Sequence, residues 1–262
     1  MGNIAFEIAL VCYLTASLGY FVHFVYRKHW VSIFARTTVM VGLLSHTAHM
    51  GIRSSITGHG PYTTTFEVAL FSAWAILVVY FLIELKYNIK NLGTFVIPLV
   101  FLILFIAAFL SKETAMVTDT ETEFWLTMHR GLSILGYAAF SIAFAAGVMY
   151  LIQEHQVKSK KLGPMYFRMP SLEVLDDLNF KVITVGFPLF TLGFITGALT
   201  HLNMNLSIFA WDVKKTWPLM AVWIIYSCVF FGRFAIGLRG KKAAQGAIIG
   251  FFAVILTYFL HV

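Results

Sequence analysis

Eight apolar runs, each about as long as a bilayer-crossing helix, dominate this 262-residue sequence and restrict what it can fold into. A membrane-spanning helix needs roughly 20 predominantly apolar residues, and backbone polar groups in lipid must be satisfied within the span, which favours helices. The runs extend approximately over residues 4–26, 31–54, 64–85, 92–110, 131–152, 182–200, 218–236 and 243–261. Only 12% of the residues are charged, against roughly 25% in soluble domains. The sequence therefore predicts an all-α, polytopic membrane helix bundle of eight transmembrane helices, forming a single transmembrane domain over residues 1–262.

The formal net charge of +7 follows the positive-inside pattern of membrane proteins and gives no reason to expect a nucleic-acid partner. Thirteen of the 19 basic residues fall in alternate connections between the runs, and only five fall in the other connections. The basic connections carry Arg27, Lys28, Lys86, Lys90, Lys158, Lys160, Lys161, Arg168, Lys181, Arg233, Arg239, Lys241 and Lys242. We expect these connections to face the cytoplasm, so that both termini are extracytoplasmic.

The two cysteines, Cys12 and Cys228, both lie within apolar runs and belong to no C-x-x-C-H haem-attachment motif. The chain is therefore not itself a c-type cytochrome, and we expect both residues to be buried free thiols.

Histidines gather toward the predicted outer face. His46 and His49 are three residues apart, so they share one face of the second helix. His129 comes just before the expected fifth helix, and His201 and His261 close the sixth and eighth. Neutral imidazole ligates haem iron, zinc or copper. Zinc and copper sites usually add carboxylates or thiols at close spacing, and no such cluster appears here. Alternatively, each histidine is an ordinary polar residue at a membrane interface.

Haem needs one or two axial imidazoles, an aromatic shelf and cations for its propionates. Trp211 and Trp217 would form the shelf, and Arg53 and Arg130 are cations at the same predicted face. A transmembrane cytochrome carrying two stacked haems is disfavoured, because no helix carries two histidines about 13–14 residues apart, nearly four helical turns.

A polar segment at 209–218 separates the sixth and seventh apolar runs. Trp211 and Trp217 bracket Asp212 and two lysines there, and Trp favours the membrane–water boundary. The segment predicts either an interfacial anchor or a docking surface. Asp212 would orient an imidazole or cap the seventh helix, whose start is marked by Thr216 and Pro218.

Three local patterns have structural interpretations. Ser171 precedes an apolar-periodic run and predicts a short interfacial helix in the connection 153–181. Gly193 and Gly197 form a pair that permits close helix approach in lipid. Glu67 in the first turn of the third helix favours the helix dipole.

These features together resemble the cytochrome c assembly family of haem-handling membrane proteins, of the CcsA, ResC and CcmC type with HemX-like relatives. Trp211-Asp212, Lys214 and Trp217 match the core of the family's external Trp-rich loop. Residues 46–53 and 58–74 form a second match, and His129 followed by 135–140 forms a third. The resemblance covers most of the chain in the same order.

The resemblance implies a haem, expected to be haem b, held at the outer face beneath the Trp-rich loop. His129 matches the upstream axial ligand, and His261 or His201 is the candidate for the second. Phe231 aligns where the family's synthetase members carry an intramembrane histidine, which favours a HemX-like member. The resemblance implies a haem-handling assembly factor rather than a self-contained enzyme.

The implied function is to hold or deliver haem for cytochrome c assembly or haem metabolism in a bacterial inner membrane; an organellar membrane is the second expectation. Expected partners are a CcsB/ResB-like membrane protein, apocytochrome c or a haem-biosynthesis enzyme. Two alternatives stay open at this point. One is a HemX-like membrane adaptor that regulates haem-biosynthesis enzymes by protein contact without haem transfer. The other is a small-molecule transporter, for which interrupted helices and mid-membrane charges would be expected.

Overall fold

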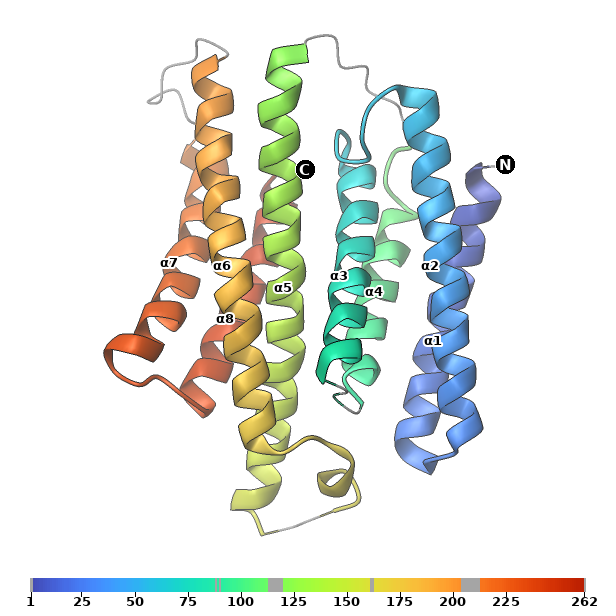
Figure 1. The fold of residues 1–262 in the computed structure, drawn as a ribbon, viewed down its shortest axis with the longest axis vertical. Helices are drawn as coiled ribbons and strands as arrows, with labels where there is room; N and C mark the ends of the chain where they lie inside the picture. The colour runs from blue at the N-terminus through green and yellow to red at the C-terminus, as the bar shows by residue number, and fades with distance from the viewer. Residues whose placement is uncertain are drawn as a thin grey trace. The chain divides into compact units, whose positions relative to one another are not determined.

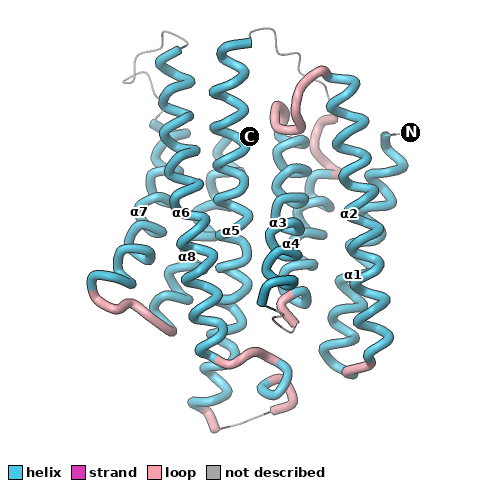
Figure 2. Tube along the Cα trace, viewed as in Figure 1, coloured by secondary structure: helices cyan, strands magenta, loops and turns pink. Residues whose placement is uncertain are grey.

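The computed structural model describes residues 2–87, 89, 91–112, 120–160, 163–203 and 213–261, and throughout these ranges the secondary structure is helical (Figures 1 and 2). Side chains at 2–3, 120–123, 201–203, 213–215 and 258–261 lie outside the description. The helices are α1 (Gly2–Tyr26), α2 (His29–Thr57), α3 (Thr65–Tyr87), α4 (Gly93–Ala107), α5 (Thr120–Lys158), a short 3-10 helix η1 (Tyr166–Arg168), α6 (Leu172–Asn203), α7 (Val213–Ala235) and α8 (Lys241–His261). The prediction of an all-α membrane bundle with eight long helices is confirmed.

Five of the described helical segments are long and apolar enough to cross a membrane. They are Ile4–Tyr26, Thr65–Tyr87, Phe124–Lys158, Leu172–Thr200 and Thr216–Ala235. A sixth apolar helix, α4, is shorter at 15 residues. The chain is therefore a multi-pass membrane protein, and the orientation of its termini stays a prediction from the charge pattern.

The chain divides into two compact units, Met1–Thr118 and Asp119–Val262, each described here by itself. In unit 1, α1 packs along α2 and α4, while α3 packs against α4 and α2. Consecutive helices run in opposite directions, so the α1–α2 and α3–α4 connections lie at one end of the unit (Figure 1). Close approach of α1 and α2 requires a glycine, because a Cβ at Gly42 would come 2.6 Å from the Tyr13 ring.

In unit 2, α5 packs against α6 and α8, and α7 packs against α8 and α6. The α5–α6 contact is close because glycines face the partner helix. A Cβ at Gly186 would lie 2.7 Å from Ala139 Cβ, and one at Gly197 would lie 2.7 Å from His129 Nδ1. The close approach predicted from Gly193 and Gly197 is confirmed.

Two predicted helix starts are wrong. Residues after Ser171 do not form a separate interfacial helix, because they continue without a break into the 32-residue α6. Ser171 does cap that helix, since its Oγ accepts a hydrogen bond from Val174 N at 3.3 Å. The seventh helix begins at Val213, so Thr216 and Pro218 lie within it.

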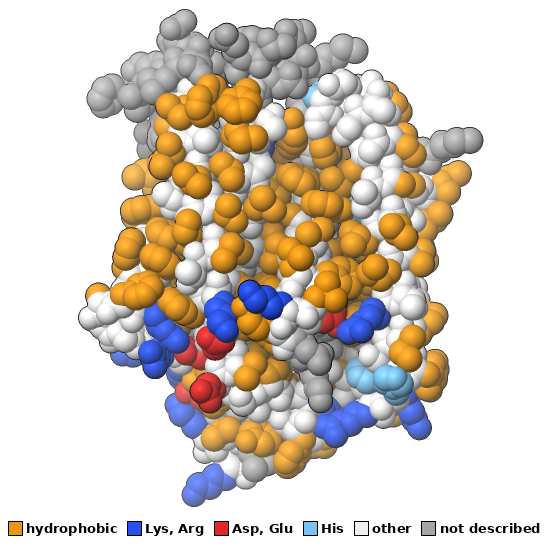
Figure 3. All heavy atoms as spheres, in the orientation of Figure 1, with side chains coloured by type: hydrophobic (Ala, Val, Ile, Leu, Met, Phe, Trp, Pro, Cys, Tyr) orange, Lys and Arg blue, Asp and Glu red, His pale blue; other side chains and the backbone are white. Residues whose placement is uncertain are grey.

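In each unit taken by itself, charged side chains gather toward the end with the α1–α2 and α3–α4, or the α5–α6 and α7–α8, connections (Figure 3). In unit 2, Asp176 ties this end together. Its Oδ2 accepts from Arg233 Nη1 at 2.7 Å, and its Oδ1 accepts from the backbone N–H of Gly240 at 2.7 Å. One carboxylate on α6 thereby holds α7 and the turn into α8.

Both cysteines are free thiols, as expected. Their burial differs from the prediction, since Cys12 is half-buried and Cys228 is exposed. An apolar run does not distinguish a lipid-facing position from a buried one, because both are apolar in a membrane protein.

Candidate functional site

His129 lies inside α5, as the tenth residue of that helix, and not ahead of it as predicted. The expected boundary at residue 131 marked the start of the apolar run. The helix itself begins eleven residues earlier, at Thr120, because polar residues continue the helix beyond the apolar segment. The imidazole therefore sits on a rigid helix.

The His129 imidazole faces α6. Its Nδ1 lies 2.7 Å from the carbonyl oxygen of Gly193. A carbonyl oxygen only accepts hydrogen bonds, so Nδ1 carries the proton and donates it. The neutral ring then has its lone pair on Nε2, which is the arrangement found in metal-ligating histidines whose other nitrogen donates to a backbone carbonyl.

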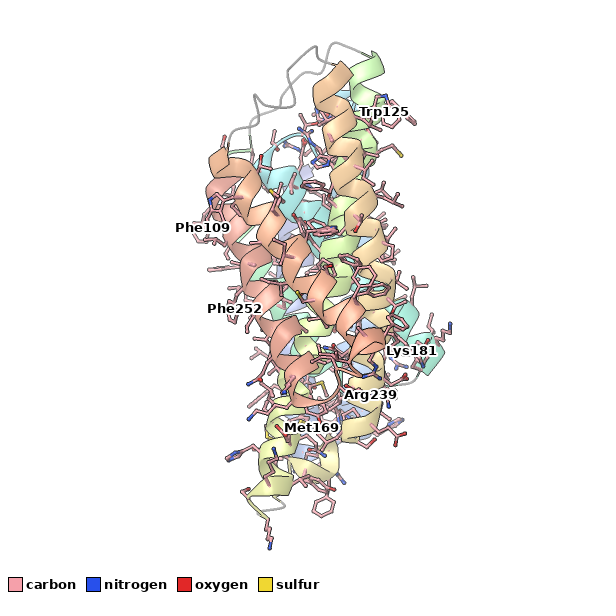
Figure 4. All side chains as sticks on the ribbon, turned by 90° about the vertical axis from the view of Figure 1, so that its left-hand side faces the viewer. Phe109, Trp125, Met169, Lys181, Arg239 and Phe252 are labelled. Carbon is pink, nitrogen blue, oxygen red and sulfur yellow. The ribbon has the colours of Figure 1, made fainter. Side chains whose placement is uncertain are left out.

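Aromatic and basic residues of α5 accompany His129. Trp125 lies one turn before it, at the end of α5 opposite to the part of unit 2 that holds Met169, Lys181 and Arg239 (Figure 4). The rings of Phe124 and Trp125 meet edge to face with centroids 5.4 Å apart. The half-buried Arg130 follows His129 directly.

The remaining predicted site residues of unit 2 are described unevenly. Trp217 lies on α7 with 49% of its surface exposed. Trp211 and Asp212 lie outside the described residues, and so do the side chains of His201 and His261. The backbone of His201 belongs to α6, four residues after Gly197, so the helical repeat puts both positions on one face.

The structure brings the predicted pair His46 and His49 into the core of unit 1, where they are 0% and 5% exposed. His46 Nδ1 lies 3.2 Å from the Tyr13 hydroxyl of α1. The His49 ring lies 5.5 Å from Phe6 and 6.1 Å from Phe66, centroid to centroid. The shared helix face was predictable from the spacing, but the Tyr13 partner was not, because it comes from a different helix.

Arg53 is bound by a buried carboxylate. Its Nε donates to Glu67 Oε1 at 2.6 Å, and Glu67 is 0% exposed. Its Nη1 also donates to the Lys112 carbonyl at 3.1 Å. The predicted propionate cation therefore ties α2 to the start of α3 and to the segment after α4.

Glu67 also accepts from the backbone N–H groups of Thr63 at 3.0 Å and Thr64 at 3.2 Å, and its own N–H donates to Thr64 Oγ1 at 3.2 Å. This is a capping box, whose Thr-x-x-Glu signature is visible in the sequence. Nothing in the sequence pattern identifies Arg53 as the fourth member of the network.

Among residues whose side chains are described, no group of three or more His, Cys, Asp or Glu side chains is placed to hold a metal ion. The donor set that the structure offers in unit 2 is instead a single helix-borne imidazole with a fixed proton. Such a donor suits one axial position of a metal that brings its own equatorial ligands, as haem iron does.

Comparison with known proteins bears on the same residues. Residues 62–261 match the family model described as cytochrome C assembly protein. A protein of Guillardia theta called cytochrome c biogenesis protein CcsA is 25% identical, with 98% of this chain and 91% of that protein covered. Proteins of the same name from Prochlorococcus marinus are also similar. That of strain MIT 9312 is 30% identical over 98% of this chain and 89% of its own length. That of strain MIT 9301 is 29% identical over 84% and 78%. The matched range includes His129 and Gly193, while His46 and Arg53 precede it.

Proposed function

Because this chain belongs to the cytochrome c assembly protein family, we propose that it binds haem through His129 and presents that haem for cytochrome c assembly. The observation that carries the proposal is the hydrogen bond from His129 Nδ1 to the Gly193 carbonyl at 2.7 Å. It leaves Nε2 as the nitrogen with a lone pair, the form of imidazole that ligates iron. The similar proteins called cytochrome c biogenesis protein CcsA agree with this role.

In this proposal the haem, as haem b, is cargo rather than a permanent cofactor. His129 holds the iron from one side, and Arg130, the next residue of α5, supplies a cation for a propionate. The chain then acts by positioning the haem edge against a C-x-x-C-H peptide of apocytochrome c, so its contribution is orientation. A CcsB/ResB-like membrane protein is the proposed companion.

The second axial ligand is proposed to be His201 or His261. The backbone register favours His201, because Gly197 lies against His129 and His201 follows on the same face of α6. His201→Ala and His261→Ala variants separate the two, since only the loss of the true ligand changes a six-coordinate low-spin haem into a five-coordinate one.

The proposed site is tested by the absorption spectrum of the protein purified after expression with ample haem. We expect a Soret band in the wild type and its loss or marked weakening in His129→Ala. His155→Ala is the matched control, because His155 is an exposed histidine near the other end of the same helix. A wild type without a Soret band would overturn the proposal and favour a haem-free adaptor, and an unchanged spectrum in His129→Ala would remove His129 from the site.

The proposed location is a bacterial inner membrane with the α5–α6 connection on the cytoplasmic side. Impermeant maleimide labelling tests this, in a background where Cys12 and Cys228 are replaced by alanine. We expect Lys112→Cys to react in intact cells and Lys160→Cys to react only after lysis, because the charge pattern puts their segments on opposite sides. The reverse labelling would contradict the orientation.

A further inference from the structure

We propose that Gly193 and Gly197 of α6 are positioning residues for the haem ligand. They select Nε2 as the iron-binding nitrogen of His129 and fix the plane of its ring. This inference rests on the proposed function, because it concerns how His129 is held. It goes further in giving two glycines that touch no haem atom a role in the iron's ligand geometry.

Gly193 acts through its backbone. Its carbonyl oxygen accepts the Nδ1 proton of His129 at 2.7 Å, and it also accepts the Thr196 hydroxyl at 2.9 Å. The oxygen belongs to a helix and cannot turn away without distorting it. A histidine held in this manner cannot present Nδ1 to a metal, so Nε2 alone is left for the iron. Partners of this kind typically change metal affinity 10- to 100-fold when they are lost.

Gly197 acts by having no side chain. A Cβ there would lie 2.7 Å from His129 Nδ1 and 2.9 Å from Cε1. Both distances are shorter than the contacts that carbon atoms tolerate. The Nδ1 side of the ring thus fills the space above Gly197, and Nε2 and Cδ2 lie farther from this glycine. An alanine would force the imidazole to rotate, and rotation breaks the hydrogen bond to Gly193.

A role in helix packing alone is the competing explanation, and the same helix provides its control. Gly186 also faces α5, where a Cβ would lie 2.7 Å from Ala139 Cβ, but nothing connects it with His129. Gly186→Ala therefore disturbs the α5–α6 contact without touching the imidazole. Gly131→Ala is a neutral control two residues from His129, because a Cβ there meets nothing within 4 Å.

The test compares wild type, Gly197→Ala, Gly186→Ala, Gly131→Ala and His129→Ala as purified full-length proteins. Electron paramagnetic resonance reports the spin state of the ferric haem, transfer to apomyoglobin reports its dissociation rate, and thermal unfolding reports stability. We expect Gly197→Ala to lose the low-spin signal and to release haem at least 10-fold faster. Gly186→Ala should unfold at a lower temperature with an unchanged signal, and Gly131→Ala should resemble the wild type.

If Gly197→Ala behaves like Gly186→Ala, with lower stability but unchanged spin state and dissociation rate, the glycines serve packing only and the inference is overturned. If His129→Ala keeps the wild-type haem signal, the proposed function fails instead, so the two failures are distinguishable.

A second variant decides the question even if Gly197→Ala does not fold. Replacing His129 with Nδ1-methylhistidine keeps Nε2 and removes the proton that Gly193 accepts. Since that hydrogen bond makes the imidazole a stronger donor to iron, its loss should raise the reduction potential or release the haem. Retained haem at an unchanged potential would contradict the role of Gly193.

Discussion

Glu67→Gln removes one charge from a buried network with almost no change of shape. In the wild type, the carboxylate accepts from Arg53 Nε at 2.6 Å and from two backbone N–H groups at 3.0 and 3.2 Å. The side chain of Glu67 is 0% exposed and that of Arg53 is 12% exposed. The amide keeps one acceptor oxygen but leaves the guanidinium nearly dry and without a counter-charge.

The expected loss follows from this burial. Removing one partner of a buried ion pair typically costs 3–5 kcal/mol, because the other charge stays desolvated. Taking the lower value, since one acceptor remains, we expect unit 1 to lose about 3 kcal/mol. For a protein of this size, 1 kcal/mol corresponds to roughly 2–4 °C, so the apparent Tm should fall by about 10 °C.

The assay is thermal unfolding in detergent, followed by tryptophan fluorescence at one scan rate. Glu154→Gln is the control, because its pair with Lys158 is an i,i+4 contact in which the lysine is 67% exposed. That variant should stay within about 0.5 kcal/mol of the wild type. Adding Arg53→Met to Glu67→Gln removes the unpaired charge and should restore part of the loss. An unchanged Tm in Glu67→Gln, or a double variant worse than the sum of the single ones, would refute the reasoning.

Two further predictions concern packing and the charged end of unit 2. Asp176→Asn should lose about 2 kcal/mol, because the carboxylate accepts from Arg233 and Gly240; Asp177→Asn, whose pair with Lys181 is about half exposed, should change the Tm little, and equal effects would contradict the assignment. Gly42→Ala should lose about 1–3 kcal/mol by overpacking against Tyr13, whereas Gly51→Ala, with nothing within 4 Å of its Cβ, should gain up to about 1 kcal/mol from helix propensity; a stabilised Gly42→Ala would show that α1 and α2 can separate at low cost.

Helix number could be predicted from the sequence because each apolar run is long enough to require a helix in lipid. Helix ends could not, because the apolar run reports the membrane and not the helix. His129 illustrates this, since α5 begins at Thr120 and the polar residues before the run are helical as well. The seventh helix shows the same error, with Pro218 inside it and not at its start.

Candidate residues could be predicted by type and by helix face, but their partners could not. The spacing of His46 and His49 put them on one face, and both are buried. The partners Tyr13 of His46, Gly193 of His129 and Arg53 of Glu67 each lie on another helix, between 14 and 64 residues away. These contacts depend on how helices pack, which one sequence does not reveal.

Imidazole rescue of His129→Gly tests the central proposal most directly. The glycine leaves the space of the missing ring, so added imidazole can enter and bind iron in its place. We predict that the purified variant lacks the wild-type low-spin haem spectrum and regains it on titration with imidazole. A His129→Gly protein that keeps the wild-type spectrum without imidazole would contradict the proposal that this residue holds the haem iron.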